Sequence, residues 1–238
     1  MPIDPQNDPE FRGPSPKPEV PRKNGCLPVV TALIVIGVLA AGSMLAHHDA
    51  RERAKRIWCS NNLKSIALAL HNYQGAYGAF PPQYTVDDQG RPLHSWRTLI
   101  LPFLDQQALY DSIDLSKPWN DPANAQAFAK PPPFYQCPLS QMKADPLNTA
   151  TYLAIIAPGG WCLPDRPRRL EEFTDGSSDT LLLIEVGEES AVPWMAPIDA
   201  DEATILSLGL NSKTVHDGGF NAAFADGRVK FLKASLPA

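Results

Sequence analysis

The residues that could do chemistry near the end of this chain are a histidine and an aspartate. His216 and Asp226 are separated by nine residues, and Gly227 follows the aspartate. A histidine that meets a carboxylate can act in acid–base catalysis or bind a metal ion. However, Asp226-Gly227 is also a turn signal, which accounts for the aspartate without any chemistry. We therefore predict that both residues are structural and that His216 holds its loop by hydrogen bonds.

Two acidic segments offer further candidate sites. Glu185, Glu188 and Glu189 lie close together in the sequence, and paired carboxylates perform glycoside hydrolysis. The segment 175–179, DGSSD, resembles part of a calcium loop, but it lacks the alternating ligands and the bidentate glutamate of an EF-hand. We interpret the glutamates as a strand end followed by a solvated loop, and DGSSD as a turn that enters a strand.

The cysteines do not have the spacing of a zinc site. The four cysteines, Cys26, Cys59, Cys137 and Cys162, contain no CxxC pair and no Cys/His zinc pattern. The sequence also lacks a phosphate-binding loop, a dinucleotide fingerprint and an HExxH motif. We therefore predict that the protein is not an enzyme and that it holds no metal or cofactor.

Four tryptophans lie in loop-rich regions beside proline or glycine: Trp96, Trp119, Trp161 and Trp194. Exposed aromatic side chains can stack on sugars or on another protein, and buried ones can pack loops onto a sheet. We favour packing. Several tryptophans exposed in one cleft would instead indicate a binding module.

The composition predicts one folded domain with appendages. The 238 residues are 44% hydrophobic, which is enough for a core, and 21 basic against 26 acidic side chains give a net charge of −5. An acidic protein lacks the basic face that nucleic-acid binding requires, so we exclude that class. Segment 1–26 contains seven of the 25 prolines. We predict that it is a disordered tail.

Segment 27–46 contains 20 residues and no charged side chain. A helix of this length spans about 30 Å, the thickness of the hydrocarbon core of a bilayer. A cleaved signal peptide is the alternative, but its apolar part is usually about 7–15 residues long and ends in a small-residue cleavage site. We predict a permanent transmembrane helix in contact with lipid. Basic residues are similarly frequent on both sides, so charge does not decide the orientation.

A helical pattern continues beyond the membrane segment. Apolar side chains recur there at spacings of four and three, which predicts one buried stripe on a helix; they are Cys59, Leu63, Ile66, Leu70, Tyr73 and Tyr77. Glycines and prolines between 75 and 82 end this helix.

The remaining sequence predicts an antiparallel sheet. Short apolar runs at 180–186, 220–225 and 228–232 are separated by turn residues, and Asp226-Gly227 predicts a type I′ hairpin turn. Segment 95–110 has a helical pattern split by Pro102, and 124–130 is a shorter helix. The chain is thus divided into the tail 1–26, the membrane helix 27–46 and a domain of class α+β over 47–238.

Several short blocks follow one another in order between residues 56 and 232: CSNNLK at 59–64, LALHNY at 68–73, YGAFPP at 77–82, SWR at 95–97, LPFLDQQ at 101–107, WN at 119–120, YQCP at 135–138, FTDGSS at 173–178 and VPW at 192–194. In sequence and in order, these blocks resemble those of the bacterial family of proteins of unknown function DUF1559. His216, Asp226 and Gly227 resemble the C-terminal signature of that family, a histidine followed after nine residues by Asp-Gly.

The resemblance implies a pilin-like domain, in which a long N-terminal helix lies against an antiparallel sheet. It also implies that the tail lies in the cytoplasm, the helix in the inner membrane and the domain outside. The implied role is that of a pseudopilin, a structural or interaction protein of the cell envelope with protein partners or self-association. The alternative is a binding module for envelope polysaccharide or for a secretion partner.

The sequence departs from this family at the prepilin peptidase site. Members that are processed have a glycine before Phe-Thr-Leu-x-Glu, whereas here Gly25 precedes Cys26 and the fifth position is Val30. We therefore expect a chain that stays anchored.

The implied compartment outside the membrane makes Cys59, Cys137 and Cys162 candidates for oxidation. Cys59 and Cys137 lie in blocks that resemble the family, so the resemblance favours a disulfide between them. Three buried thiols are the alternative.

Overall fold

The computed structural model describes residues 27–137, 148–157, 160–164, 166–173, 175–208, 216 and 218–233. The predicted tail 1–26, with its Gly25-Cys26 site, lies outside the described residues. The chain forms two compact units, Met1–His47 and His48–Ala238. Helix α1, Leu27–Tyr77, contributes residues to both units.

The N-terminal part of α1 contains the predicted membrane segment. From Val30 onward this helix is long and apolar enough to cross a membrane, and none of its most apolar window is buried within the protein. The helix ends at Tyr77, followed by Gly78 with a positive φ of 78°. The Gly78 amide donates to the Gln74 carbonyl at 2.7 Å. A glycine at this position satisfies a terminal carbonyl without steric cost, which explains the end of the helix.

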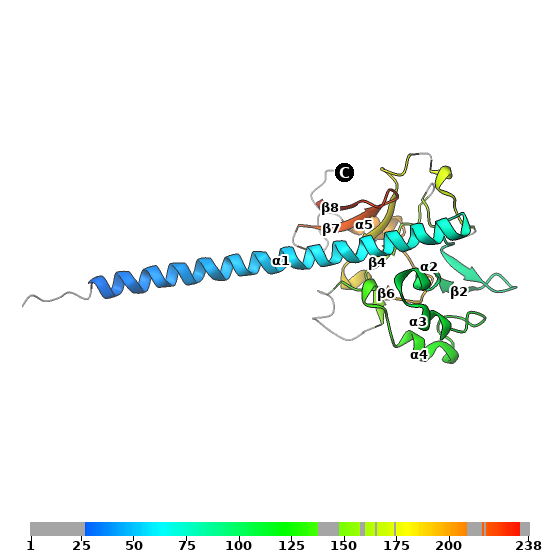
Figure 1. The fold of residues 1–238 in the computed structure, drawn as a ribbon, viewed down its shortest axis with the longest axis horizontal. Helices are drawn as coiled ribbons and strands as arrows, with labels where there is room; N and C mark the ends of the chain where they lie inside the picture. Colours follow the sequence, from blue (N-terminus) through cyan, green and yellow to red (C-terminus); the bar gives the residue numbers. More distant parts are fainter. Residues whose placement is uncertain are drawn as a thin grey trace, which may run out of the picture. The chain divides into compact units, whose positions relative to one another are not determined.

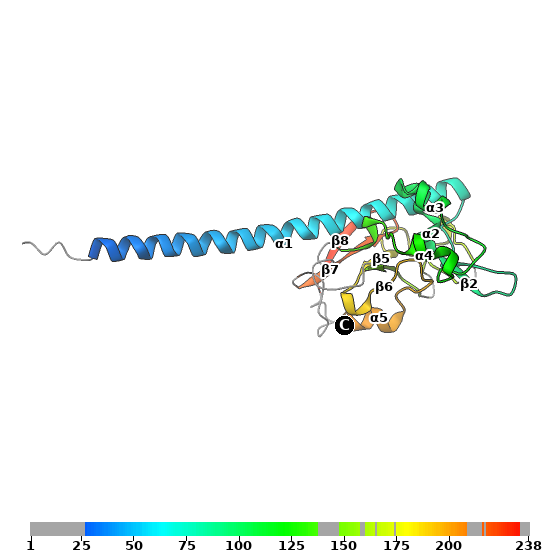
Figure 2. The same cartoon turned by 90° about the horizontal axis from the view of Figure 1, so that it is seen from below.

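The C-terminal part of α1 supplies one side of the hydrophobic core. Cys59, Leu63, Ile66 and Leu70 are fully buried, which confirms most of the predicted stripe, whereas Tyr77 is 68% exposed because it lies at the helix end. Figures 1 and 2 show this part of α1 lying along the sheet of the domain. Each fully buried leucine or isoleucine stabilises the fold by about 1.5–3 kcal/mol.

The main sheet has four antiparallel strands in the order β4-β5-β7-β8. These strands are β4 Tyr152–Ala154, β5 Leu181–Glu185, β7 Gly219–Phe224 and β8 Val229–Lys233. Two small antiparallel pairs lie beside it: β1 Tyr84–Val86 with β2 Pro92–Ser95, and β3 Thr149–Ala150 with β6 Val192–Pro193. The predicted strands at 180–186, 220–225 and 228–232 are confirmed as β5, β7 and β8, and the predicted class α+β is confirmed with them.

The turn between β7 and β8 differs from the predicted type I′ turn. The Phe224 amide donates to the Arg228 carbonyl at 2.8 Å, so the loop contains three residues rather than two. Gly227 has a φ of 82°, but Asp226 does not have the positive φ that a type I′ turn requires at both central positions. Instead, the Asp226 carboxylate accepts from the Arg228 amide at 3.0 Å. A three-residue loop with a left-handed glycine is the next most common hairpin connection.

The remaining helical segments are short. The predicted helix at 95–110 is broken into α2 Trp96–Leu99, a 3₁₀ turn at Leu101–Leu104 and α3 Gln107–Asp111. Pro102 and the left-handed Asp105, with a φ of 56°, cause the two breaks. Among the described residues, the other segments are α4 Ala125–Phe128, α5 Glu202–Ser207 and 3₁₀ turns at Pro122–Asn124, Pro133–Tyr135, Leu170–Glu172 and Glu188–Ser190.

The tryptophans pack the loops onto the core, as we favoured. Trp96, Trp161 and Trp194 are fully buried, and Trp119 is half-buried against the core. The Trp161 indole donates to the Leu182 carbonyl of β5 at 2.6 Å. These four side chains therefore do not form the exposed aromatic surface that was the alternative.

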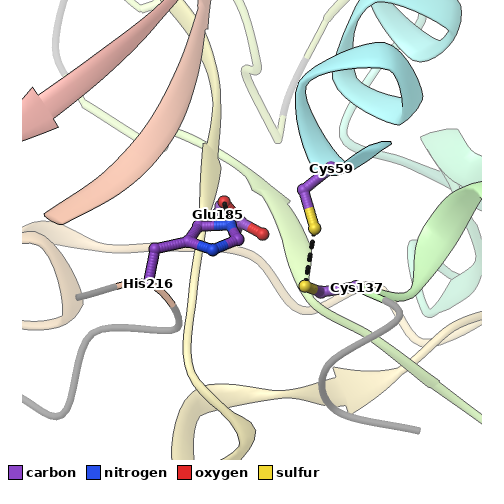
Figure 3. A group of neighbouring side chains, drawn as sticks. All are labelled: Cys59, Cys137, Glu185 and His216. Carbon is purple, nitrogen blue, oxygen red and sulfur yellow. Dashed lines mark hydrogen bonds and ion pairs between the residues drawn. The ribbon is translucent and has the colours of Figure 1, made fainter. Parts of the chain in front are cut away.

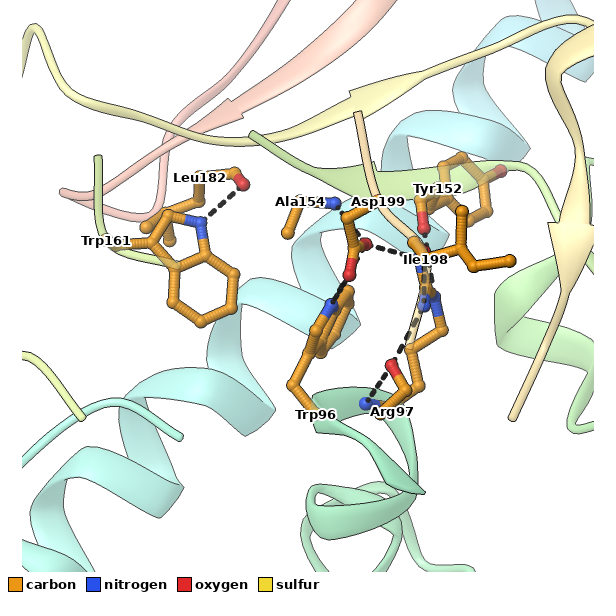
Figure 4. A network of polar contacts seen from close by, with 9 residues as sticks. Trp96, Arg97, Tyr152, Ala154, Trp161, Leu182, Ile198 and Asp199 are labelled. Atoms are coloured by element: carbon orange, nitrogen blue, oxygen red, sulfur yellow. Dashed lines mark hydrogen bonds and ion pairs between the residues drawn. The ribbon is translucent and has the colours of Figure 1, made fainter. Parts of the chain in front are cut away.

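A buried ion pair joins the loop before α5 to the first short helix. Arg97 and Asp199 are both fully buried, and Arg97 Nη2 lies 2.5 Å from Asp199 Oδ1. Figure 4 shows the Asp199 carboxylate between Arg97 and the indole of Trp96, which donates to both oxygens at 3.1 Å. The backbone amide of Ala154, on β4, donates to Oδ1 at 2.9 Å. A buried charge is stable only when it is paired in this way, so the pair fixes these elements together.

The substitution Asp199→Asn should strongly destabilise the domain. It preserves the shape of the side chain but leaves the Arg97 guanidinium buried without a carboxylate, which costs about 3–5 kcal/mol. Urea unfolding of the full-length protein in detergent, followed by tryptophan fluorescence, would measure the loss.

The control for this experiment is Glu52→Gln. It removes a pair with Lys55, at 2.8 Å, in which both side chains are 31% exposed, and should cost less than about 1 kcal/mol. Equal losses in the two variants would contradict a special role for the buried pair.

Candidate functional site

Four buried side chains from separate parts of the chain converge in the core. Cys59 lies on α1, Cys137 follows the 3₁₀ turn at Pro133–Tyr135, Glu185 ends β5, and His216 precedes β7. One ligand-type atom from each lies within 4.8 Å of the others. Figure 3 shows the two sulfurs facing each other beside the His216 ring and the Glu185 carboxylate. We call these four residues the Cys-Glu-His cluster.

Backbone and neighbouring contacts hold the two cysteines in place. Cys59 belongs to the buried stripe of α1. The Cys137 amide donates to Thr151 Oγ1 at 2.9 Å, and Asn62 Nδ2 on α1 donates to the Gln136 carbonyl at 3.3 Å. These contacts bring the segment around Cys137 to the same turn of α1 that carries Cys59.

Glu185 and His216 are positioned by the sheet. Glu185 Oε2 accepts from the Asn221 amide at 3.2 Å and from Asn221 Nδ2 at 2.7 Å, and it lies 3.1 Å from His216 Nε2. The Gly219 amide at the start of β7 donates to the His216 carbonyl at 3.2 Å. Glu185 Oε1 is also buried but has no hydrogen-bond partner within the described residues.

The electrostatics of the cluster favour a charged pair beside neutral thiols. The hydrogen bond with Cys137 and burial raise the pKa of Cys59 far above its usual value. Burial alone would raise the pKa of Glu185, but hydrogen bonding to His216 and Asn221 lowers it overall. Burial alone would lower the pKa of His216, but its interactions with Cys59 and Glu185 raise that pKa to about 9. At neutral pH, therefore, Glu185 and His216 form an ion pair and Cys59 is protonated.

Cys59 and Cys137 meet as the resemblance implied. Their Sγ atoms lie 2.6 Å apart as two thiols in hydrogen-bonding contact, so the predicted disulfide is not confirmed. Cys162 is also buried but is not part of the cluster. The sequence contains no zinc spacing, and spacing alone did not anticipate that four donor side chains from distant positions would meet.

The other candidate residues from the sequence do not join this cluster. Asp226 is exposed in the hairpin, where it pairs with Arg228, while His216 is fully buried at Glu185. Glu188 and Glu189 are exposed in a 3₁₀ turn, as we predicted, and only Glu185 points into the core. The segment 175–179 forms a turn in which the Thr180 amide donates to the Gly176 carbonyl at 3.2 Å.

Sequence reasoning missed the importance of Glu185 and Asp199. Glu185 was interpreted as the polar end of a strand, but it is fully buried in the apolar run of β5. A carboxylate within such a run signals a partner, because an unpaired buried charge is too costly. The sequence therefore indicated that Glu185 has a buried partner, but it did not indicate that this partner is His216.

A basic pocket of about 390 Å³ lies on the surface between α1 and β8. Arg53, Arg56 and Lys64 of α1 line it together with Asn221 of β7 and Phe231 of β8. The Arg56 guanidinium lies over the Phe231 ring, 5.0 Å from its centroid. Three cationic side chains around one pocket favour an anionic ligand.

Residues 48–157 match the family model SBP_bac_10, described as "Protein of unknown function (DUF1559)". The resemblance to the DUF1559 family is therefore confirmed for this segment. The match includes Cys59 and Cys137, whereas Glu185, His216 and the His-x9-Asp-Gly pattern lie beyond it. No curated protein and no solved structure matches the chain.

The buried thiols of the cluster should resist modification while the protein is folded. After reduction and metal chelation, Cys59 and Cys137 should react with a maleimide about 100-fold or more slower than an exposed thiol, because reaction requires local opening. Peptide mapping by mass spectrometry would measure both rates.

The exposed reference is the variant Ala76→Cys, at an exposed position on α1. Labelling of Cys59 and Cys137 as fast as the introduced thiol would contradict the buried arrangement of the cluster.

Proposed function

We propose that this protein is a single-pass, non-enzymatic component of the bacterial cell envelope with a structural or interaction role similar to that of pseudopilins. In this proposal residues 27–46 anchor it permanently in the inner membrane, the tail is cytoplasmic and the domain 47–238 is extracytoplasmic. The match to the DUF1559 family model and the apolar N-terminal helix are compatible with a membrane-anchored envelope protein.

The observation that carries this proposal is the dual composition of α1. The same helix contains an apolar segment suited to a bilayer and, further on, a stripe that is buried in the domain core. The segment proposed as the anchor is thus continuous in sequence with a helix that forms part of the domain core. A domain held at a membrane in this way suits a protein that positions or assembles with others.

The outer face of α1 supports an interaction role. Ile57, Trp58 and Leu68 are 61%, 62% and 62% exposed. Ile57 and Leu68 lie about three turns apart on the same face of the helix. Large apolar side chains on one helix face are suited to contact with a partner helix or a second copy of the chain.

Charges placed in the middle of the apolar segment should release the protein from the membrane. Each arginine at the centre of a membrane helix costs about 2.5–3.5 kcal/mol. The double variant Ile36→Arg with Val38→Arg should therefore lose resistance to alkaline carbonate extraction, whereas wild-type protein stays in the membrane pellet.

The matched control is Leu68→Arg, on the exposed face of α1 within the domain, which should remain in the pellet. In spheroplasts, a membrane-impermeant maleimide should label Ala76→Cys if the domain is outside. Mature protein that begins after residue 46 would contradict the permanent anchor, and one that begins at Cys26 would show prepilin-type processing.

The second candidate is an extracytoplasmic binding module, and the basic pocket favours it. Arg53, Arg56 and Lys64 suit an acidic envelope polysaccharide. The double variant Arg56→Gln with Lys64→Gln should bind polygalacturonate about 2–30-fold more weakly than wild type, because two ionic contacts of about 0.2–1 kcal/mol each are lost. Arg91→Gln, an exposed arginine outside the pocket, is the control. Binding that neither variant changes would contradict this alternative.

A further inference from the structure

We propose that the Cys-Glu-His cluster is a buried tetrahedral site for a divalent metal ion of the zinc class, with Cys59, Cys137, Glu185 and His216 as its four ligands. The metal ion would bind only when Cys59 and Cys137 are both reduced. It is independent of the proposed envelope role and would fail or succeed separately from it.

The set of donor atoms is the first argument. Zinc in structural sites takes four ligands, chosen from cysteine sulfur, histidine nitrogen and carboxylate oxygen. The cluster offers two sulfurs, one imidazole and one carboxylate, with their ligand atoms within 4.8 Å of one another. Soft thiolates together with an imidazole disfavour magnesium and calcium, which prefer oxygen ligands.

The second argument is that a disulfide accounts for only half of the cluster. A bond between Cys59 and Cys137 would leave the buried Glu185 and His216 side by side with no function in the core. Burying two such groups is costly, and apolar side chains of similar volume often stabilise a core more. A metal ion instead gives all four side chains a role and supplies a positive charge to the buried carboxylate.

The surroundings of Glu185 provide a third, independent observation. Asn221 donates twice to Oε2, which orients the carboxylate, while Oε1 has no hydrogen-bond partner within the described residues. Ligand carboxylates are commonly held by such outer hydrogen bonds. Asn221 is therefore assigned as a positioning residue.

Metal binding requires a small rearrangement and no redox step. The Sγ atoms are 2.6 Å apart, whereas two thiolates on one zinc ion lie about 3.8 Å apart, given Zn–S bonds of about 2.3 Å. The sulfurs must therefore separate by roughly 1 Å. The two thiols and the imidazolium each lose a proton to solvent, and the metal accepts one lone pair from each of the four ligands.

The location of the cluster defines what the ion would do. Its ligands come from α1, from the segment before β3, from β5 and from His216, which lies three residues before the start of β7. One ion would thus fasten the helix that carries the apolar segment to the sheet. Such a cross-link has the mechanical effect of a disulfide without requiring an oxidising compartment.

The test uses full-length protein in detergent, reduced and stripped of metal, then titrated with Co²⁺ and Zn²⁺. We expect one ion per chain by elemental analysis. Cobalt should give the visible bands of tetrahedral coordination and a thiolate charge-transfer band, both abolished by Zn²⁺. Zinc should also raise the thermal unfolding midpoint of the stripped protein, because it binds only the folded state.

Substitutions distinguish the proposed metal ligands from residues outside the site. Cys59→Ser and Cys137→Ser should each weaken the charge-transfer band and the thermal shift, and the double variant should lose both. Cys162→Ser, a buried cysteine outside the cluster, should retain both. Asn221→Ala should keep the band but bind Zn²⁺ about 10–100-fold more weakly. If a ligand variant fails to fold, the wild-type cobalt spectrum still decides the coordination.

Three outcomes would overturn the proposal. The first is protein from its native membrane that lacks metal and is linked between Cys59 and Cys137, shown by an intact mass two hydrogens below the reduced form. The second is a reduced chain that gives no tetrahedral cobalt spectrum. The third is metal binding that Cys59→Ser leaves unchanged.

Discussion

The domain depends on the burial of one stripe of α1 against the sheet. Leu63, Ile66 and Leu70 are fully buried there, and together they contribute about 5–9 kcal/mol. This is comparable to the whole stability of a typical domain, about 5–15 kcal/mol. Because this stripe supplies one side of the hydrophobic core, the domain cannot lose its contact with the C-terminal part of α1 without losing that core.

Polar interactions then decide how the loops are arranged around this apolar contact. The Arg97–Asp199 pair is fully buried and is surrounded by donors from Trp96 and Ala154. A buried pair of this kind adds little net stability compared with apolar packing, but breaking it leaves an uncompensated charge. Its physical effect is specificity, because loop arrangements that separate the two charges are excluded. The strands and 3₁₀ turns of this domain benefit from such a constraint, since each of the described ones is at most six residues long.

The Cys-Glu-His cluster lies where the helix, the sheet and a loop meet. Its residues are fully buried, so in this conformation a substrate cannot reach Glu185 or His216. The convergence of a histidine and a carboxylate therefore does not argue for hydrolysis, although it is the pair that acid–base catalysis would need. A role in holding elements together agrees with burial, with the donor atoms present and with a helix that must remain attached to its sheet. The basic pocket, by contrast, is open to solvent and is the better place to look for a ligand.

The sequence by itself determined the elements that local patterns encode. Length and apolarity predicted the membrane segment, a spacing of three and four predicted the buried stripe of α1, and apolar runs between turn residues predicted β5, β7 and β8. The predicted type of the hairpin turn was wrong, because the turn type depends on how the two strands pair. In the three-residue loop that forms, Asp226 does not have a positive φ. Only the tertiary structure brought Glu185 to His216 and Asp199 to Arg97, because residues far apart in sequence meet only when long-range packing decides the register. The apolar pattern of a segment predicts which of its residues are buried, but it does not predict which residues from other segments they contact.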